Sequence, residues 1–279
     1  MPAAPFSPPS ILPSRQLYIQ PLRNAFIVGV ARSGSSILGE LIAAHPQVDY
    51  LFEVHQIWEV GGAGINASHR LTAEHATPQV AKAIQTWFAE RQTPDRLLLE
   101  KNPRNVLRIP YLRAIFPEAR IIHLVRDGRD AACSMVPGCG GEKWLHLKPP
   151  SWNTFFSEYS GAVRCAHAWQ EAAEIALADL ASVFHLLLRY ESLLTQPEKI
   201  LGQFLDFLEL ESSAETSAFL SRLQDDTVGS YQAREQAFWF RDDHKVRMGR
   251  YKENLTMGEL AEINSFLAPT LTKLGYPIQ

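Results

Sequence analysis

The chain has 279 residues, of which 46% are hydrophobic and 20% are charged, and its formal net charge at pH 7 is −3. This length and apolar content allow one large α/β domain with a sizeable core. A weakly acidic chain argues against a protein that binds nucleic acid over its whole surface. We therefore expect any anion site to be local, and we expect no nucleic-acid partner.

The cysteines and the N-terminus predict a cytoplasmic location. The three cysteines are an odd number without the spacing of a zinc site or of a secreted disulfide framework. The first residues lack the basic start and apolar core of a signal peptide, and no window reaches the roughly 18 apolar residues of a membrane span. Residues 1–20 are expected to form a flexible proline-rich arm, and residues 21–279 a single domain without a membrane span.

Predicted strands and helices alternate along the chain. The apolar run over 24–30, followed by helical spacing over 34–45, predicts a strand, a tight loop and a helix. Further strands are predicted over 96–101, 119–125 and 182–190, and further helices over 77–92, from 127 onwards, and over 158–180, 196–208 and 257–271. The alternation predicts an α/β fold of the P-loop type, with three layers and a central parallel sheet flanked by helices. In such a fold, ligands bind beyond the carboxyl ends of the strands.

A long segment over 137–160 has no periodicity. Long loops of this kind usually serve function, and we expect this one to be a lid on the acceptor side of the site. Its aromatic residues either line an apolar acceptor pocket or pack on one another. They are Trp144, Trp152, Phe155 and Phe156.

A glycine-bearing turn follows the first predicted strand. Gly29 and Gly34 have the G-x-x-x-x-G spacing of a phosphate-binding loop, in which backbone N–H groups and the helix dipole together hold a phosphate. Ser35 stands where an ATP-using P-loop enzyme requires a lysine, and Arg32 supplies a cation from within the loop instead. Taken alone, the turn is equally compatible with an ordinary strand–helix connection that carries a surface arginine.

A second basic motif follows the strand predicted over 119–125. Arg126 emerges at the carboxyl end of that strand, and Ser134 lies eight residues further, two turns along the expected helix. The forked guanidinium donor and the hydroxyl suit a phosphate monoester. The alternative interpretation is a solvated ion-pair cluster with the neighbouring charged residues.

Four motifs, in this order, resemble the family of sulfotransferases that use 3′-phosphoadenosine 5′-phosphosulfate (PAPS). They are A-R-S-G-S-S, E-K-N-P, H-L-V-R-D-G-R-D-x-x-x-S and R-Y-E-S-L-L-T-Q-P-E. The V-R-D-G-R and R-Y-E-S-L segments look most like the tyrosylprotein sulfotransferase branch and its bacterial relatives. The resemblance implies transfer of a sulfuryl group from PAPS, with 3′-phosphoadenosine 5′-phosphate (PAP) as the product and without a metal.

The resemblance also implies which residues hold the nucleotide. Arg126 and Ser134 correspond to the 3′-phosphate site, and the segment 225–257 resembles a loop that covers the nucleotide. The 5′-phosphosulfate site corresponds to Arg32 and the backbone of Ser33, Gly34, Ser35 and Ser36. Weaker correspondences, each also typical of a core or surface residue, are Tyr190, Ser230, Gly249 and Arg250.

The catalytic residues follow from the same resemblance. Lys101 matches the lysine that contacts the bridging oxygen of the donor, where it stabilises the leaving phosphate together with Arg32. Some members use a histidine two residues beyond this lysine as the base, but Pro103 occupies that position here. The tyrosylprotein branch uses a glutamate, and counting from a shared His-Pro pair brings Glu53 onto it, with His55 as the reserve candidate.

The acceptor and the oligomeric state stay open. His55 and Gly138 stand where the peptide-sulfating enzymes have arginines. A small molecule, a glycan or a peptide is therefore expected as the acceptor of the sulfuryl group on a hydroxyl or amine, and a homodimer is left open.

Two other functions compete with this interpretation. A P-loop kinase requires a lysine after Gly34 and an acidic residue at a strand end for Mg²⁺, whereas the chain has Ser35 and Arg126 there. A non-catalytic nucleotide-binding protein would keep the fold without the chemistry. The presence of Glu53 and Lys101 argues against it.

Overall fold

A parallel sheet forms the centre of the fold. The computed structural model describes residues 23–60, 68–139, 143–224 and 248–278. Within them the strands are β1 (Asn24–Val28), β2 (Val48–Phe52), β3 (Leu97–Lys101), β4 (Arg120–Val125) and β5 (His185–Arg189). Their order is β2-β3-β1-β4-β5, and every neighbouring pair is parallel. The carboxyl ends of all these strands therefore lie along one edge of the sheet.

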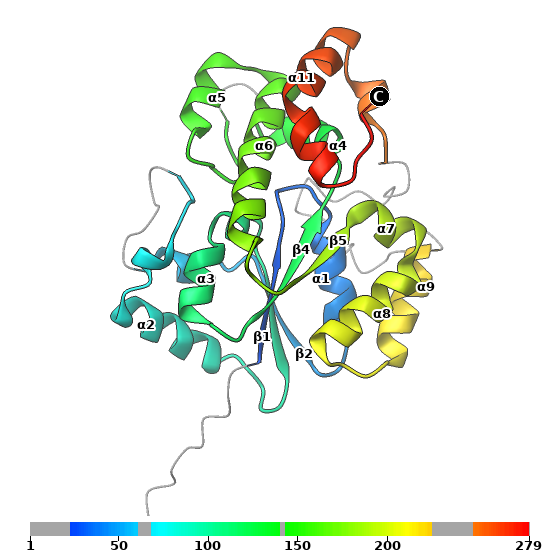
Figure 1. Cartoon of the computed structure of the whole chain (residues 1–279). Coiled ribbons are helices and arrows are strands. Elements are labelled where there is room, and N and C mark those ends of the chain that lie inside the picture. The colour runs from blue at the N-terminus through cyan, green and yellow to red at the C-terminus, as the bar shows by residue number, and fades with distance from the viewer. Residues whose placement is uncertain (1–22, 61–67, 140–142, 225–247, 279) are drawn as a thin grey trace, which may run out of the picture.

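Helices cover both faces of the sheet (Figure 1). One apolar core includes residues of α2 (Pro78–Ala89), α3 (Ile109–Ile115), α4 (Gly128–Met135), α6 (Gly161–Leu180) and α11 (Met257–Lys273). The other includes residues of α1 (Ser35–Ala43), α7 (Tyr190–Thr195), α8 (Pro197–Leu208) and α9 (Ala214–Gln224). Successive residues of β1 alternate between the two, with Phe26 in the first core and Ile27 in the second, as the two-residue repeat of a strand requires. The predicted three-layer α/β fold is confirmed.

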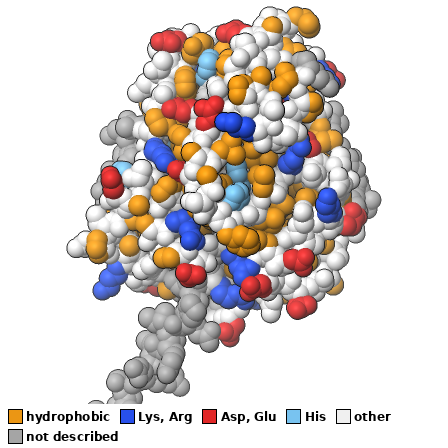
Figure 2. All heavy atoms as spheres, viewed as in Figure 1, with side chains coloured by type: hydrophobic (Ala, Val, Ile, Leu, Met, Phe, Trp, Pro, Cys, Tyr) orange, Lys and Arg blue, Asp and Glu red, His pale blue; other side chains and the backbone are white. Residues whose placement is uncertain are grey.

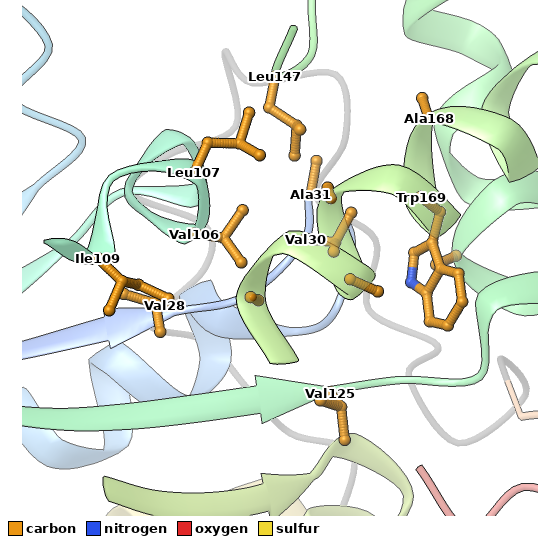
Figure 3. Close-up of a cluster of buried hydrophobic side chains, with 14 of the residues drawn as sticks. Val28, Val30, Ala31, Val106, Leu107, Ile109, Val125, Leu147, Ala168 and Trp169 are labelled. Carbon is orange, nitrogen blue, oxygen red and sulfur yellow. The ribbon is translucent and has the colours of Figure 1, made fainter. Parts of the chain in front are cut away.

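The core reaches up to the carboxyl edge of the sheet. Figure 3 shows part of the larger of the two buried clusters, with Val30, from the turn after β1, near Trp169 of α6. Trp169 packs on Gly128, where an added Cβ would lie 2.6 Å from the indole ring. The absence of a side chain at the start of α4 thus allows α4 and α6 to pack closely. Each large apolar side chain buried in this way contributes about 1.5–3 kcal/mol.

The first predicted strand ends two residues earlier than expected, at Val28. Gly29 follows the strand and lies so close to β4 that an added Cβ would be 2.4 Å from the carbonyl oxygen of Leu124, so only glycine fits there. The strand predicted over 182–190 is also shorter, since α7 begins directly at Tyr190.

The prediction missed β2 and α9. β2 is only five residues long, and Asp49 interrupts its apolar run after the first residue, so the sequence signal is short. Asp49 accepts hydrogen bonds from the Thr93 backbone N–H and from Arg96, which ties β2 to the turn before β3. These partners are far from β2 in sequence, and the local pattern therefore does not reveal the strand.

The segment 137–160 is not a single irregular loop. It contains the end of η4 (Val136–Gly138) and a helix, α5 (Trp152–Glu158). The helix predicted over 158–180 begins only at Gly161, after an extended Ser160. The prediction of one aperiodic loop is therefore wrong, because α5 is too short to show a clear helical repeat.

The outer strand β5 carries exposed apolar side chains. Leu187 is 47% exposed, and Phe184, just before the strand, is 86% exposed. In Figure 2, hydrophobic atoms gather over the middle of the face shown, with charged side chains around them.

Across the described ranges, no helix is both long and apolar enough to cross a bilayer.

Candidate functional site

The turn between β1 and α1 is tight. Arg32 and Gly34 both have left-handed backbone conformations, with φ of 70° and 91°. The Ser33 N–H donates to the Val30 carbonyl oxygen at 3.2 Å, and α1 then begins with the Leu38 N–H donating to the Gly34 carbonyl oxygen. Left-handed residues immediately before a helix N-terminus form the concave backbone that binds anions. The backbone of the turn therefore suits an anion, and the assignment of its residues to a phosphate stays a prediction.

The two predicted anion motifs meet directly. The Arg126 Nη1 donates to the carbonyl oxygen of Arg32 at 3.0 Å, and the Arg32 Nε donates to the Ser134 Oγ at 3.0 Å. Arg126 has only 6% of its side chain exposed, so it is not part of a solvated surface cluster. The sequence assigned Arg32 to one end of the nucleotide and Ser134 to the other, whereas the structure places their side chains in contact.

Tyr190 packs between the turn after β1 and the residue that follows β4. Its ring lies under the guanidinium of Arg126, with the arginine Cζ 4.7 Å from the ring centroid. The ring also packs on Gly34, where an added Cβ would be 2.3 Å from the Tyr190 Cδ2. Tyr190 is buried. It is thus a core residue that also contacts both anion motifs, and the two interpretations of it are compatible.

Lys101 and Glu53 form an ion pair at the ends of β3 and β2. The pairing of β2 with β3 sets this geometry, because the Glu53 N–H donates to the Lys101 carbonyl oxygen at 2.9 Å. Glu53 itself has a left-handed backbone, with φ of 48°. The Lys101 side chain is 1% exposed and lies 4.2 Å from the centroid of the Phe52 ring. A buried ammonium thus faces a carboxylate that is partly open to solvent.

The tautomer of His55 follows from its neighbours. The Asn102 Oδ1 accepts from the Arg104 backbone N–H, so its Nδ2 is the atom 3.1 Å from the His55 Nδ1. The His55 Nδ1 must therefore accept, and Nε2 carries the proton. That Nε2 lies 3.8 Å from the Glu53 Oε2. Burial, with a further effect of Arg104, lowers the pKa of His55 to about 4, so the ring is neutral near pH 7.

His146 is a residue near the site that the motifs did not indicate. Its Nε2 donates to the Met135 carbonyl oxygen at 2.9 Å, and its ring packs on Gly138. The pKa of His146 is lowered to about 4, mainly by burial and to a smaller extent by Arg32, while the hydrogen bond to Met135 and the charge of Glu53 act in the opposite direction. The ring is therefore a neutral group within electrostatic range of both anion-site and base candidates. No motif in the sequence marks it.

Three of the four aromatic residues of the predicted lid pack on one another, whereas Phe155 stacks on His167 of α6 with 5.5 Å between ring centroids. Trp144 lies 5.6 Å from Trp152 and 6.2 Å from Phe156, measured between ring centroids. The guanidinium of Arg164 lies 4.7 Å from the centroid of Phe156. These contacts agree with the alternative in which the lid residues pack against each other.

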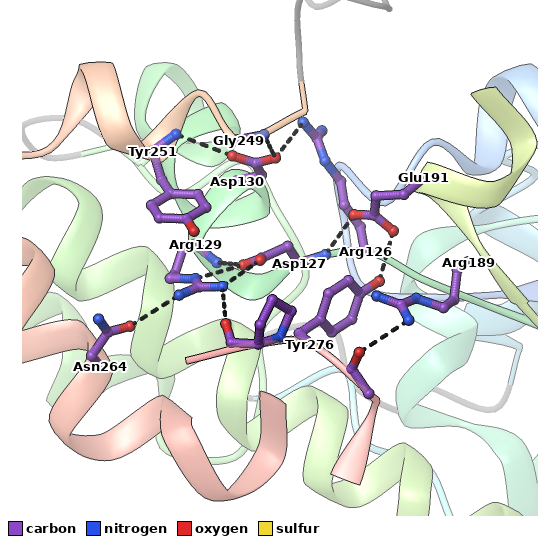
Figure 4. A network of polar contacts seen from close by, with 12 residues as sticks. Arg126, Asp127, Arg129, Asp130, Arg189, Glu191, Gly249, Tyr251, Asn264 and Tyr276 are labelled. Atoms are coloured by element: carbon purple, nitrogen blue, oxygen red, sulfur yellow. Dashed lines mark hydrogen bonds and ion pairs between the residues drawn. The ribbon is translucent and has the colours of Figure 1, made fainter. Parts of the chain in front are cut away.

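The end of the chain is tied to the start of α4 (Figure 4). Glu191 accepts from the Asp127 N–H at 3.0 Å and from the Tyr276 hydroxyl at 2.9 Å. Arg129 donates to both oxygens of Asp127 and, at 2.8 Å, to the Pro277 carbonyl oxygen. The loop that follows Arg126 is therefore fixed from two directions.

The remaining weaker candidates for nucleotide binding are Gly249, Arg250 and Ser230. Gly249 has a left-handed backbone, with φ of 73°, and its N–H donates to Asp130, four residues after Arg126. Arg250 directly precedes α10 (Tyr251–Asn254). Ser230 lies outside the described residues. Where the chain is described, no group of three or more histidine, cysteine, aspartate or glutamate side chains is placed to hold a metal ion.

Comparison with known proteins gives a consistent family. A model described as the sulfotransferase family matches residues 24–214. The chain is 25% identical over 213 residues to "Protein-tyrosine sulfotransferase 2" of Gallus gallus, covering 70% of this chain and 53% of the relative. It is 27% identical over 210 residues to "Protein-tyrosine sulfotransferase 1" of Danio rerio, covering 70% and 55%. The chain thus spans about half the length of these curated relatives.

Solved structures share the fold. The "Sulfotransferase Domain from the Curacin Biosynthetic Pathway" superposes with a TM-score of 0.59 at 18% identity, covering 93% of this chain and all of that one. The corresponding domain of the Synechococcus PCC 7002 olefin synthase gives a TM-score of 0.57 at 19% identity, covering 92% and 96%. Mouse SULT7A1 complexed with PAP gives 0.50 at 13% identity, covering 89% and 83%. At these identities the likeness shows the fold.

Proposed function

Since this chain belongs to the sulfotransferase family, we propose that it transfers a sulfuryl group from PAPS to a hydroxyl or amine of an acceptor. The observation that carries the proposal is the ion pair between Lys101 and Glu53 at the ends of β3 and β2. β3 also pairs with β1, whose end leads into the glycine turn. A cation, a carboxylate and an anion loop thus follow three adjacent strands, as transfer of a charged group requires.

The residues at the carboxyl edge fit a nucleotide with phosphates at two positions. Arg126 is buried, yet its guanidinium is held beside the turn by the Arg32 carbonyl oxygen and the Tyr190 ring. Arg32 and Ser134 add a second guanidinium and a hydroxyl from the turn and from α4. We assign the turn to the 5′-phosphosulfate, and Arg126 with Ser134 to the 3′-phosphate, since guanidinium and hydroxyl donors suit phosphate oxygens.

The transfer step needs one proton acceptor and one cation. As the acceptor oxygen forms its bond to sulfur, the bond from sulfur to the bridging oxygen breaks, and Glu53 takes the hydroxyl proton. Lys101 then offsets the negative charge that grows on the departing phosphate, and Arg32 acts as the second cation. His55 is unsuited as the base, because its lone pair at Nδ1 is directed to Asn102 and its protonated Nε2 faces Glu53. We assign His55 the role of orienting the Glu53 carboxylate.

The acceptor is proposed only as a class: a small molecule, glycan or peptide with a hydroxyl or amine. The relatives named above are protein-tyrosine sulfotransferases, so the acceptors to be tested include a tyrosine peptide. Incubation of the protein with radiolabelled PAPS and a panel of phenols, sugars, amines and tyrosine peptides should label at least one acceptor without added metal. Absence of PAPS and PAP binding, together with absence of labelling, would contradict the proposal.

A further inference from the structure

Asp130 holds two backbone N–H groups from a distant part of the chain. Its Oδ2 accepts from the Gly249 N–H at 2.7 Å, and its Oδ1 accepts from the Tyr251 N–H at 3.1 Å. These residues are separated from Asp130 by 119 and 121 positions. The Asp130 side chain is only 2% exposed, so the carboxylate is desolvated and depends on these donors and on a nearby cation.

That cation is Arg126, the central residue of the proposed 3′-phosphate site. The Arg126 Nη2 lies 3.9 Å from the Asp130 Oδ2, one helical turn along the chain. The same guanidinium donates through Nη1 to the carbonyl oxygen of Arg32. Figure 4 shows the contacts from Gly249 through Asp130 to Arg126. The hydrogen bond from Arg126 to Arg32 continues this chain of contacts to the anion turn.

The backbone at Gly249 has a conformation that only glycine adopts readily. Gly249 is left-handed, with φ of 73°, and no atom lies within 4 Å of a Cβ added there. Glycine is therefore required by the backbone and not by packing. The next residues continue into α10, and the Tyr251 ring packs under the guanidinium of Arg129, 4.2 Å from its Cζ. The carboxylate of Asp130 fixes the backbone where this segment reaches α4.

We propose that Asp130 is a positioning residue that fastens the segment 249–251 to Arg126, so that nucleotide binding and the order of this segment depend on one another. The inference rests on the proposed function for the identity of the nucleotide. The attachment itself can be tested without any nucleotide. Coupled sites of this kind typically change each other's affinity by about 5- to 150-fold.

The first experiment measures hydrogen–deuterium exchange of the wild-type protein, Asp130→Asn and Glu253→Gln. Asparagine keeps the shape of aspartate but offers one acceptor oxygen for two N–H groups, so exchange in peptides covering 248–255 should become faster. Glu253 is exposed on α10, and Glu253→Gln removes one carboxylate charge within the peptides that are measured, whereas Asp130 lies on α4; its exchange should match the wild type. Unchanged exchange in a folded Asp130→Asn protein would overturn the inference.

The second experiment measures PAP affinity and steady-state kinetics for the same proteins. Asp130→Asn should weaken PAP binding about tenfold and raise the KM for PAPS more than it lowers kcat, because the residue positions Arg126 without touching the reacting atoms. Equal PAP affinity in Asp130→Asn and wild type would overturn the positioning role. If the wild type itself binds no PAP, the proposed function fails, while the exchange experiment still decides whether Asp130 holds the segment.

A third variant protects the test against simple loss of folding. Gly249→Ala strains the segment from its own side, because alanine resists positive φ, and it leaves the Asp130 carboxylate intact. If both substitutions act through the same attachment, the loss of PAP affinity in the double variant should be clearly smaller than the product of the two single losses. Independent, multiplicative losses would contradict a shared mechanism.

Discussion

The carbonyl oxygen of Arg32 accepts a hydrogen bond from the guanidinium of Arg126 at 3.0 Å. This contact joins the turn after β1 to the end of β4, two neighbouring strands of the sheet. The motifs that contain these arginines are separated by 94 positions in sequence. Arg32 supplies its backbone carbonyl and Arg126 its side chain, so the two motifs form one anion site. A substitution in either motif should therefore weaken anion binding at the other.

Substitution of Glu53 should separate chemistry from binding. Glu53→Gln keeps the shape of the side chain and an acceptor for Lys101, but it removes the proton acceptor. We expect transfer to fall by about 100- to 10,000-fold, with PAP affinity nearly unchanged. His55→Gln should lower transfer far less, since His55 only orients the carboxylate. Full activity in Glu53→Gln, with loss of activity in His55→Gln, would exchange the two roles.

Gly34 should not tolerate a side chain. Gly34→Ala places a Cβ 2.3 Å from the Tyr190 ring at a residue with φ of 91°, so we expect a loss of about 1 kcal/mol or more in stability together with weaker PAP binding. Gly202 lies within α8, with no atom within 4 Å of an added Cβ. Gly202→Ala should instead stabilise by about 0.5–1 kcal/mol. Urea unfolding and PAP titration of both variants measure these effects, and equal behaviour of the two would contradict the packing role of Tyr190.

The hydroxyl of Tyr276 should contribute to stability. Tyr276→Phe removes the hydrogen bond to Glu191 and leaves a half-buried carboxylate with one donor fewer, at an expected cost of about 1–3 kcal/mol. Tyr111→Phe deletes the same atom where the buried hydroxyl has no hydrogen-bond partner among the described residues. That control should be neutral or stabilising. A smaller loss for Tyr276→Phe than for Tyr111→Phe in urea unfolding would refute this account of the C-terminal attachment.

Stability should decrease below a pH of about 6.5, because several histidines are neutral in the fold. Burial lowers the pKa of His55 and His146 to about 4 and that of His123 to about 3. Between these values and the ordinary histidine pKa of about 6.5, the unfolded chain binds more protons than the folded one. The stabilisation is therefore complete above a pH of about 6.5 and is lost progressively as the pH falls toward about 4 for His55 and His146 and about 3 for His123.

Unfolding free energies measured at pH values from about 7.5 down to about 4.5 test this dependence. His123→Leu removes one titrating ring whose Nδ1 has no hydrogen-bond partner in the described part of the chain, so the slope should become shallower. A flat profile for the wild type, or an unchanged slope in the variant, would contradict the explanation.

The residues that end apolar strands could be predicted from the sequence, because local pattern and position coincide there. Arg126 and Lys101 follow buried runs that the structure confirms as β4 and β3. The position of the Glu53 side chain could not be predicted in the same way. It depends on the pairing of β2 with β3, which joins segments that are far apart in the sequence. The resemblance nevertheless indicated both Glu53 and Lys101, and the structure places their side chains in an ion pair.

Contacts between distant segments lay beyond the sequence pattern. The bond between Asp130 and Gly249 and the contact of Tyr190 with Gly34 depend on how helices pack on the sheet. The helix α5 was not predicted within the lid for a related reason. A helix this short shows no clear sequence repeat and is stabilised by its packing on the rest of the protein. The cytoplasmic location, the single domain and a homodimer stay predictions.

Calorimetric titration with PAP in the absence of Mg²⁺ tests the central claim most directly. We expect the wild type to bind PAP, Arg126→Ala to bind about 100-fold more weakly or not at all, because loss of one buried charged partner costs about 2–5 kcal/mol, and exposed Arg91→Ala to bind like the wild type. Wild-type affinity for PAP in Arg126→Ala, or equal binding of ATP with Mg²⁺, would contradict a sulfated-nucleotide site built on these two arginines.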